Sequence, residues 1–511
     1  MRSIGLLNKK YDKGNTPTKS FLSSLAERDS YLSVQNVTSY TRRHFLTGAG
    51  ATLLSAALPA FGETPASATT INDAALPPAP VAHANPPVAS TTAPDEAYTV
   101  TDLEIPTVTP TSITFSWSVY RTPHTPHLFP NERRASDAEV WLSDKTTGPL
   151  TRVHQSYSRT GLHFVTITGL RPNTTYRFEC RSLGRVATPG LWFTIRNKEP
   201  ETQGKVHTLS RPGGRYLHSM AISNDIHLGK KGHSVTTEPW PEAMIMGMLS
   251  DVKRRGIDRI YINGDLCDNG SLAEARRLKE LLDTFGQYHK NYFLTRGNHD
   301  GYAALTDPLN YSQDKDPIAA VFPHLAPQHA WIVRDHGFRV LGIDTSYPGL
   351  TGGHITSQQF TQIEKLLAAD PYRPTIVMAH HPVTEAAARS DMRPNIVNAK
   401  DALQLQQLFQ KAPGVFFMAA GHTHRAHRDA PDLPGGPQFA QLGAAGPYPG
   451  GYAILDFYEG GYTVTFHRTA TATALAQTAF NRYKSGYEKY GEHSVGLLAD
   501  RCFTVKRTLT N

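Results

Sequence analysis

The sequence predicts two folded parts, an all-β sandwich followed by an α/β domain. Between residues 97 and 198, short runs of alternating apolar and polar residues are separated by turn residues, which is typical of a β-sandwich. Between residues 213 and 469, apolar strands alternate with amphipathic helices, which favours an α/β fold. A length of 511 residues agrees with this division, because one hydrophobic core seldom serves a chain that long.

The composition is that of a soluble globular protein, with 39% hydrophobic and 19% charged residues. The net charge is +8, but half of this excess lies in the first 68 residues, which carry eight Lys and Arg against four Asp and Glu. The remaining positive charge forms no Lys/Arg block, so we expect no specific nucleic-acid partner, although a mildly basic surface attracts anionic substrates. The three cysteines, Cys180, Cys267 and Cys502, are too few for a disulfide framework or a cysteine-based zinc site. A single bridge between Cys180 and Cys502 remains open.

Residues 1–68 are predicted to be an export signal. The paired Arg42 and Arg43 precede a short, weakly apolar stretch and then a small-residue Ala-Ser-Ala site. The two arginines resemble the twin-arginine signal of bacteria, which a dedicated export machinery recognises. A stable transmembrane anchor is the less favoured alternative, because the apolar stretch is rich in Gly and Ala and is followed by Pro59. We therefore expect a bacterial periplasmic, cell-surface or extracellular protein whose Pro/Ala/Thr-rich segment 69–96 is an extended linker.

Two segments of the predicted sandwich resemble the fibronectin type III family. They are Thr109–Trp117 and Gly169–Phe178. The resemblance implies that Trp117 is the core tryptophan of the sandwich and that Tyr176 is its corner tyrosine. Both residues are therefore expected to be structural.

Metal-binding residue types follow five apolar strands of the second part, each at the point where the strand ends. Taken singly these fragments are weak signals, because an Asp in a turn or a His at a surface is common. The ordered set is a stronger signal, since ligands bind at the carboxyl ends of strands in α/β folds and the five loops can converge there. The five groups are Asp225 with His227, Asp265, Arg296 with Asn298, His299 and Asp300, His380 with His381, and His422 with His424.

Seven of these side chains are candidate metal ligands, namely Asp225, His227, Asp265, Asn298, His380, His422 and His424. A mixture of imidazole, carboxylate and amide ligands suits Fe, Mn or Zn, whereas Ca²⁺ requires mainly oxygen ligands. The set exceeds what one tetrahedral ion needs, so we expect two metal ions that share a carboxylate. Two such ions can polarise a phosphoryl oxygen, generate hydroxide from bound water and stabilise an in-line transition state.

The order of these motifs over about 216–468 resembles the calcineurin-like metallophosphoesterase superfamily. The resemblance implies an αββα sandwich that hydrolyses a phosphate diester or monoester outside the cytoplasm by attack of metal-bound hydroxide. It also implies that Asp265 bridges the two ions. One ion would be held by Asp225, His227 and His424, and the other by Asn298, His380 and His422.

The same resemblance implies roles for the residues around the ions. His299 would contact the phosphate and protonate the leaving oxygen, and Asp300 would orient the His299 ring through a carboxylate–imidazole hydrogen bond. Asn298, Arg296 and His381 would contribute to substrate binding.

One position departs from a well-known subgroup of this superfamily. Purple acid phosphatases have a tyrosine ligand three residues after the bridging aspartate, and Asp268 occupies that place. The segments Gly264–Gly270 and Gly353–Phe360 are more similar to class III cyclic-nucleotide and glycerophosphodiester phosphodiesterases. We therefore favour a phosphodiesterase, with two alternatives: a phosphomonoesterase, or a non-catalytic cell-surface protein that binds through its sandwich. The sequence indicates neither the substrate nor a role for residues 470–511.

Overall fold

The computed structural model describes residues 98–121, 133–190, 193, 198–306, 315–390, 396–484 and 493–509. The export signal predicted for residues 1–68 and the linker predicted for residues 69–96 lie outside these ranges. Among the helices described, none combines the length and the apolar character that a membrane crossing requires.

The first folded part consists of two antiparallel sheets that enclose one apolar core. β1, β2 and β5 form one sheet, and β4, β3, β6 and β7 form the other, with β8 beside β6. β3 and β6 bury every second residue, as a strand with one face on the core must. The strands are β1 Tyr98–Val108, β2 Ile113–Arg121, β3 Ser136–Ser143, β4 Thr151–Ser158, β5 Leu162–Ile167, β6 Thr175–Ser182, β7 Arg185–Val186 and β8 Lys205–His207, and α3 Pro200–Gln203 precedes β8.

The two aromatic residues predicted to be structural are both buried in this part. Trp117 is fully buried in β2, and its indole Nε1 donates a hydrogen bond to Ser182 Oγ at 2.9 Å. The hydroxyl of Tyr176 accepts a hydrogen bond from the backbone N–H of Arg171 at 2.9 Å. Each buried aromatic ring thus has a partner for its polar atom, which is the usual condition for burying Trp or Tyr.

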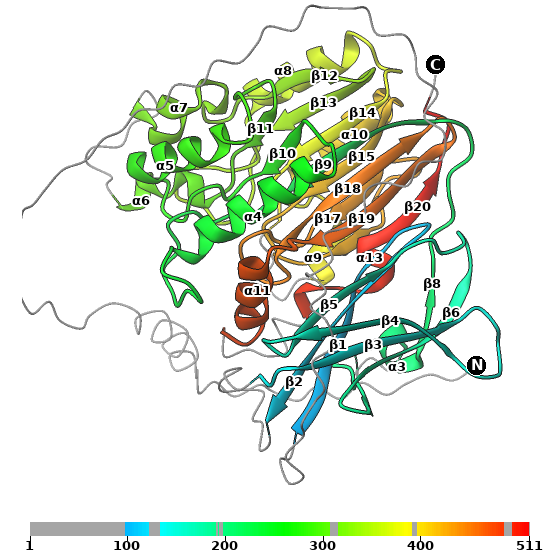
Figure 1. Cartoon of the computed structure of the whole chain (residues 1–511). Helices are drawn as coiled ribbons and strands as arrows, with labels where there is room; N and C mark the ends of the chain where they lie inside the picture. Colours follow the sequence, from blue (N-terminus) through cyan, green and yellow to red (C-terminus); the bar gives the residue numbers. More distant parts are fainter. Residues whose placement is uncertain are drawn as a thin grey trace, which may run out of the picture. The chain divides into compact units, whose positions relative to one another are not determined.

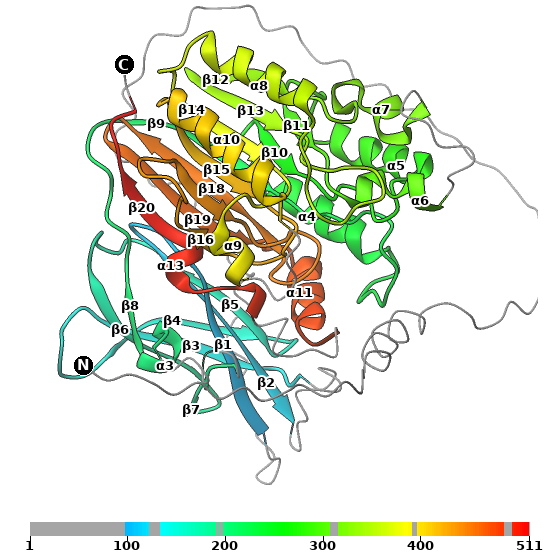
Figure 2. The ribbon, with the colours of Figure 1, turned by 180° about the vertical axis from the view of Figure 1, so that it is seen from behind.

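The second folded part has four layers in the order helix, sheet, sheet, helix (Figures 1 and 2). One sheet has the strand order β11-β10-β9-β18-β19-β20, and the other β12-β13-β14-β15-β17-β16. The strands β9, β10 and β11 are parallel to one another, as are β13, β14, β15 and β17. The first sheet consists of β9 Tyr216–Ser223, β10 Ile260–Asn263, β11 Tyr292–Thr295, β18 Gly451–Tyr458, β19 Gly461–Arg468 and β20 Cys502–Lys506. The second consists of β12 Trp331–Asp335, β13 Phe338–Ile343, β14 Thr375–Ala379, β15 Val415–Ala420, β16 His427–Asp429 and β17 Gln438–Gln441.

Three apolar cores separate the four layers. The first lies between the first sheet and its helices, α4 and α5, and the third lies between the second sheet and α8 and α10. The middle core lies between the sheets and includes Ile222 and Tyr261 from the first sheet and Ile376 and Phe417 from the second. Strands such as β10 and β14 are therefore buried on both faces, which explains their continuous apolar runs. The αββα order predicted from the sequence is confirmed. The helices are α4 Trp240–Arg254, α5 Leu272–Asp283, α6 Ala303–Thr306, α7 Pro317–Val321, α8 Ser357–Ala368, α9 Glu385–Ser390 and α10 Ala399–Lys411, with short 3₁₀ turns η1 His299–Gly301 and η3 Pro323–Leu325.

The C-terminal segment, for which the sequence indicated no role, joins the two folded parts. α11 (Ala472–Lys484) packs on α4, and α13 (Leu498–Arg501) lies against both β1 and β16. The buried guanidinium of Arg501 donates hydrogen bonds to the carbonyls of Ile105 and Pro106 in β1, at 2.7 and 3.2 Å. β20 then adds a strand to the edge of the first sheet beside β19. Cys502 begins this strand and is a free thiol like Cys180, so the disulfide left open by the sequence is absent.

A buried charge cluster also links β1 to the second folded part. Glu104 lies 2.8 Å from Arg468 Nη1 and 3.5 Å from Arg482 Nη1, and it accepts a hydrogen bond from the Tyr448 hydroxyl. Burial alone would raise the pKa of Glu104, but the two arginines beside it lower that pKa from 4.5 to about 2. The carboxylate therefore stays charged and paired at neutral pH.

We expect this cluster to make the stability of the protein sensitive to acid. Because the pKa of Glu104 is lower in the folded state, its contribution is complete above about pH 4.5 and is lost as the pH falls towards 2. The Glu104→Gln variant should lose about 3–5 kcal/mol of unfolding free energy at neutral pH, because two buried arginines lose a charged partner. Its stability should also change less between pH 5 and 3 than that of the parent, measured by urea unfolding. Parallel pH profiles for the two proteins would contradict this assignment.

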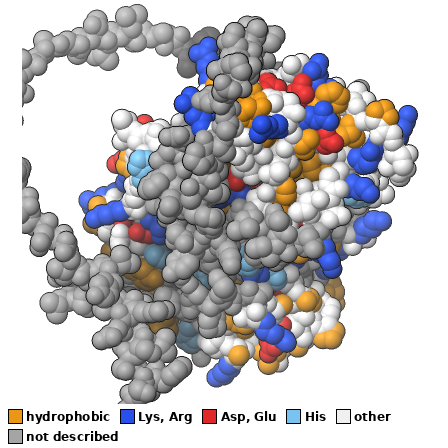
Figure 3. Space-filling view, turned by 90° about the horizontal axis from the view of Figure 1, so that it is seen from below, with side chains coloured by type: hydrophobic (Ala, Val, Ile, Leu, Met, Phe, Trp, Pro, Cys, Tyr) orange, Lys and Arg blue, Asp and Glu red, His pale blue; other side chains and the backbone are white. Residues whose placement is uncertain are grey.

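Lys and Arg side chains are scattered among acidic and apolar ones over the described surface that is visible in Figure 3. The visible face thus carries no block of positive charge, in agreement with the sequence pattern.

Candidate metal centre

Five loops from the two sheets meet at one place, and they carry all seven candidate ligands. Three loops follow β9, β10 and β11 of the first sheet, and two follow β14 and β15 of the second. The ligand atoms form two groups, and within each group they lie no more than 4.8 Å apart. One group contains Asp225, His227, Asp265 and His424, and the other contains His380, His381 and His422. Asn298 lies beside the second group, with its Oδ1 3.2 Å from His380 Nε2.

In the first group, lone pairs of four side chains converge on one point. His227 Nε2 lies 2.9 Å from His424 Nε2 and 3.6 Å from Asp265 Oδ2, and His424 Nε2 lies 3.7 Å from Asp225 Oδ1. Burial lowers the pKa of His227 to about 4, so its ring is neutral at physiological pH. Two neutral imidazole nitrogens and two carboxylates at such spacing are a suitable ligand set for a transition-metal cation.

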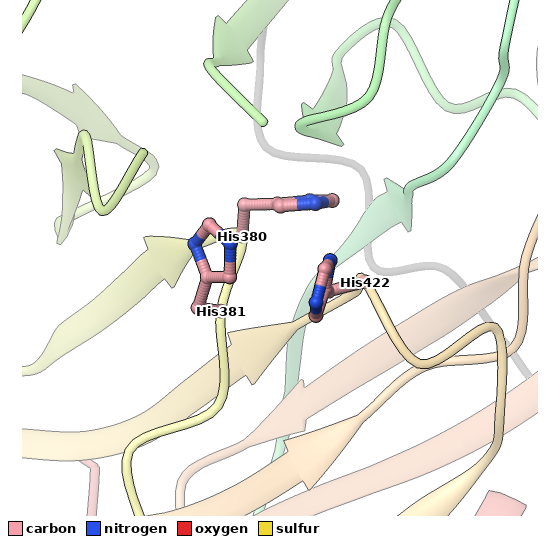
Figure 4. A group of neighbouring side chains, drawn as sticks. All are labelled: His380, His381 and His422. Atoms are coloured by element: carbon pink, nitrogen blue, oxygen red, sulfur yellow. The ribbon is translucent and has the colours of Figure 1, made fainter. Parts of the chain in front are cut away.

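The second group lies where β14 and β15 end, as Figure 4 shows for its three histidines. His380 Nδ1 lies 3.0 Å from the carbonyl oxygen of Asn263, which requires this nitrogen to carry the proton. Its Nε2 is therefore directed towards Asp265 Oδ1, at 3.2 Å. The buried Nδ1 of His422 has no hydrogen-bond partner among the described residues, and such an orphan atom is costly unless a ligand satisfies it. This group also fits a metal cation.

The carboxylate of Asp265 lies between the two groups. Its Oδ2 faces His227 and its Oδ1 faces His380, so the two oxygens are directed to different groups. Burial by itself would raise the pKa of Asp265, but the neighbouring His380 holds it well below its usual range. Burial would likewise lower the pKa of His380, but the carboxylates of Asp265 and Asp225 raise it to about 9. The carboxylate is thus ionised and placed as a bridging ligand would be.

The backbone is unusual at these positions, which the sequence did not indicate. Five candidate ligands adopt positive φ angles, a region that residues with a Cβ atom avoid. Such conformations persist where surrounding structure enforces them, and they cluster at functional sites. The angles are 52° at Asp225, 51° at His227, 47° at Asp265, 68° at His422 and 54° at His424.

Two glycines leave room for the ligands. Gly264 has a φ of 78°, and a Cβ atom there would overlap the ring of His380. Gly297 has no positive φ, but a Cβ atom there would overlap Asp265. The positive φ angle is a second reason for glycine at position 264, whereas Gly297 is required by space alone.

His299 lies at the edge of the first group. Its Nδ1 lies 2.8 Å from the backbone carbonyl of Asp268 and donates to it, which leaves Nε2 on the side of Asp265 Oδ2, at 4.0 Å. The predicted hydrogen bond between this ring and the Asp300 carboxylate is wrong. The Asp300 carboxylate instead accepts hydrogen bonds from three backbone N–H groups, those of Leu266, Cys267 and Gly297. Asp300 thus ties the loop after β10 to the loop after β11.

Arg296 does not bind substrate as predicted, because it is fully buried beneath the site. Its guanidinium makes two hydrogen bonds to the carboxylate of Asp316, at 2.8 and 2.9 Å. It also donates to the carbonyl oxygens of Leu325 and Asp300. An arginine that follows a strand end is thus a structural anchor here.

We expect the Arg296→Met variant to be strongly destabilised. Removal of one member of a buried ion pair leaves the other charge without a partner, which costs about 3–5 kcal/mol. Urea unfolding should show this loss, while the KM of whatever enzyme remains folded should change little. A variant of normal stability with a greatly raised KM would restore the substrate-binding role.

His381 also has a role different from the predicted contact with substrate. Its Nε2 lies 3.0 Å from the carbonyl oxygen of Thr351 and its Nδ1 lies 2.9 Å from Thr345 Oγ1, so both ring nitrogens have partners. The side chain is fully buried. His381 therefore fixes the segment after β13 against the end of β14.

Two side chains that support the candidate ligands were not identified as such from the sequence. Asp268 Oδ1 lies 3.3 Å from His227 Nδ1, where it orients that ring; the sequence had marked Asp268 only because it replaces a tyrosine. The hydroxyl of Tyr302 accepts a hydrogen bond from Asn298 Nδ2 at 2.9 Å, which directs Asn298 Oδ1 towards His380. No feature of the sequence pointed to Tyr302.

Residues 219–426 match the family of calcineurin-like phosphoesterases. The chain carries a calcineurin-like phosphoesterase domain. This domain is that of a metal-dependent phosphoric ester hydrolase. The geometry agrees with it, because the domain's strands supply two clustered groups of metal-binding side chains.

Curated relatives of the phosphoesterase domain include three phosphodiesterases. A probable cyclic nucleotide phosphodiesterase of Synechococcus sp. is 23% identical over 41% of this chain and 74% of its own length. A probable glycerophosphodiester phosphodiesterase of Arcobacter nitrofigilis is 24% identical over 33% of this chain and 57% of its own length. A cAMP/cGMP dual specificity phosphodiesterase of Mycobacterium tuberculosis is 29% identical over 35% of this chain and 52% of its own length. The chain thus spans little more than half of the last two relatives.

The solved structures that the chain matches include a dimetal phosphatase from Danio rerio. It is 14% identical, with a TM-score of 0.37 over 50% of this chain and 98% of its own. A purple acid phosphatase from yellow lupin is 15% identical, with a TM-score of 0.35 over 73% of this chain and 72% of its own.

Proposed function

We propose that the chain is a dinuclear-metal phosphodiesterase. The observation that carries this proposal is the Asp265 carboxylate, whose two oxygens face two separate groups of candidate ligands. The relatives favour a diester substrate, since the three named above are described as phosphodiesterases. Asp268 supports the same choice, because it removes the tyrosine that purple acid phosphatases place there.

The ligand sets divide between the two groups. Asp225, His227 and His424 would hold one ion, and Asn298, His380 and His422 the other, with Asp265 shared between them. Fe, Mn or Zn suits this mixture of ligands. When bound, the two ions would supply Lewis acidity for the phosphoryl oxygens and an activated water.

The remaining residues orient the substrate and move a proton. His299 donates its Nδ1 proton to the Asp268 carbonyl, which leaves Nε2 facing the site. In the imidazolium form of the ring, the Nε2–H would bind the phosphate and pass its proton to the leaving oxygen. Tyr302 holds the amide of Asn298 so that the oxygen, and not the nitrogen, is presented to the metal.

Two aryl substrates test the proposal. The purified protein, loaded with Mn²⁺, Zn²⁺ or Fe, should hydrolyse bis-p-nitrophenyl phosphate with a higher kcat/KM than p-nitrophenyl phosphate, and should contain two metal ions per chain. A higher kcat/KM for p-nitrophenyl phosphate would favour the phosphomonoesterase alternative. A protein that binds two metal ions but cleaves neither ester would contradict the proposed phosphoesterase activity.

The proposal also places the reaction outside the cytoplasm, with a fibronectin type III-like sandwich preceding the enzyme. Its support is the sequence around Arg42 and Arg43, which resembles a twin-arginine signal. The Arg42→Lys/Arg43→Lys double variant should remain in the cytoplasm, whereas the parent should appear in the periplasm or medium; cell fractionation with an antibody measures this. Unchanged export of the double variant would remove the twin-arginine route.

A further inference from the structure

Solvent reaches the metal centre at a few of its side chains, as their exposed fractions show. The side chains of Asp225, His227, Asp265 and His380 are at most 2% exposed. In contrast, His299 is 24% exposed, His424 23% and Asp268 21%. His422 in the second group is partly exposed as well. The site is thus open to solvent where these four residues lie, and a substrate must approach through this opening.

Lys230 stands at this opening. It belongs to the turn that follows His227, since its backbone N–H donates to the His227 carbonyl at 3.0 Å. Its ammonium Nζ lies 3.3 Å from Asp268 Oδ1, and its side chain is 37% exposed. The same Asp268 oxygen lies 3.8 Å from His299 Nδ1. The ammonium and the His299 ring thus share the Asp268 carboxylate at the opening.

The ammonium is also able to take a second partner. A lysine has three N–H donors, and the contact with Asp268 uses one of them. An ion pair this exposed is weak, so a substrate anion can share the lysine at little cost. Arg296 offers a contrast, because its guanidinium is fully buried and bonded to Asp316.

We propose that Lys230 determines specificity by binding a second anionic group on the leaving alcohol of the substrate. The inference rests on the proposed function, in which His299 protonates the leaving oxygen. Because Lys230 shares Asp268 with His299, its charge would meet the alcohol that departs rather than the phosphoryl group. The substrate class is therefore a phosphate diester whose leaving group carries a carboxylate or a phosphate.

Two synthetic diesters of matched shape test this assignment. They are methyl 4-carboxyphenyl phosphate and methyl 4-carbamoylphenyl phosphate, whose leaving groups differ chiefly by one negative charge. The measured quantity is the ratio of their kcat/KM values, because a general loss of activity cancels in it. We expect the parent to prefer the carboxylate, and the preference to fall by about three- to five-fold in Lys230→Met, the size of effect that a partly exposed ion pair produces.

Three comparisons separate specificity from structural damage. Lys230→Arg retains the charge and should retain the preference, whereas Lys231→Met removes the adjacent, exposed charge and should not alter the ratio. High salt should weaken the preference of the parent, since exposed charges are screened. Metal content should be the same in all four proteins.

The outcomes distinguish this inference from the proposed function. A parent that cleaves both diesters without preferring the carboxylate, or with a preference that survives in Lys230→Met, overturns the role of Lys230 alone. An equal loss of preference in Lys231→Met also overturns it, because a general surface charge would then be responsible. A parent that cleaves neither diester overturns the proposed function, and this inference with it.

Discussion

The Asp265→Ala variant should lose both metal ions and its activity together. Each oxygen of Asp265 faces a different group of candidate ligands, so truncation removes a ligand from both groups at once. It also leaves the buried His380 without the carboxylate that raises its pKa. Loss of a supporting residue outside the ligand set costs about 10- to 100-fold in affinity or activity, so loss of the shared ligand should cost more. Metal analysis by mass spectrometry and turnover of bis-p-nitrophenyl phosphate measure the two effects.

Asp265→Asn is the matched variant, because it keeps the volume and one acceptor oxygen. We expect Asp265→Asn to bind less than one metal ion per chain and to have far less activity than the parent. Circular dichroism of both variants should show the parent's secondary structure, which excludes unfolding as the cause. An Asp265→Ala protein with two ions and full turnover would remove the bridging role and the two-metal centre with it.

Much of the fold was predictable because each layer leaves a periodic pattern in the chain. The helix Ser357–Ala368 was predictable, since its apolar residues recur at helical spacing. Strands such as Val415–Ala420 were predictable because burial on both faces produces a continuous apolar run. The C-terminal residues 470–511 have no such pattern. Their role depends on contacts with β1 and α4, which lie far away in the sequence.

The candidate ligands were also predictable, because their residue types and their places at strand ends both appear in the sequence. The directions in which the neighbouring side chains point do not appear in the sequence. Asp300 and His299 are adjacent in the chain, yet the Asp300 carboxylate is turned to backbone N–H groups of two loops. Arg296 precedes the ligand loop, yet it extends away from it to reach Asp316. A short motif gives residue types and spacing, whereas the side-chain direction depends on the tertiary partner.

The contacts that support the candidate ligands also depend on tertiary partners that the sequence does not reveal. In the sequence, Asp268 was notable only because it replaces the tyrosine ligand of purple acid phosphatases. In the structure, its carboxylate lies 3.3 Å from both His227 Nδ1 and Lys230 Nζ. Tyr302 supports Asn298 through one hydrogen bond that no spacing rule predicts. Backbone strain at Asp225 and Asp265 depends on the loops around them and leaves no trace in residue type.

The His299→Ala variant should keep its metal ions and lose rate in proportion to the difficulty of the leaving group. His299 is not among the seven candidate ligands, and its Nε2 lies 4.0 Å from Asp265 Oδ2, on the side open to solvent. A general acid contributes about 10²- to 10⁴-fold where the leaving oxygen needs a proton. The loss in kcat should therefore be small for p-nitrophenyl diesters and largest for alkyl diesters. A series of diesters with leaving alcohols of increasing pKa measures this dependence.

His336→Ala provides the control, because this exposed histidine pairs with Asp335 in the turn between β12 and β13. It should leave the metal content and the leaving-group dependence unchanged. If His299→Ala instead loses a metal ion, His299 is a ligand, since Asp268 and His227 already form a third group of potential ligands with it. If it keeps both ions and loses rate equally for all leaving groups, His299 binds the phosphate without supplying the proton. Only a loss that grows with the pKa of the leaving alcohol assigns the proton to His299, and it would also place the leaving group beside Lys230.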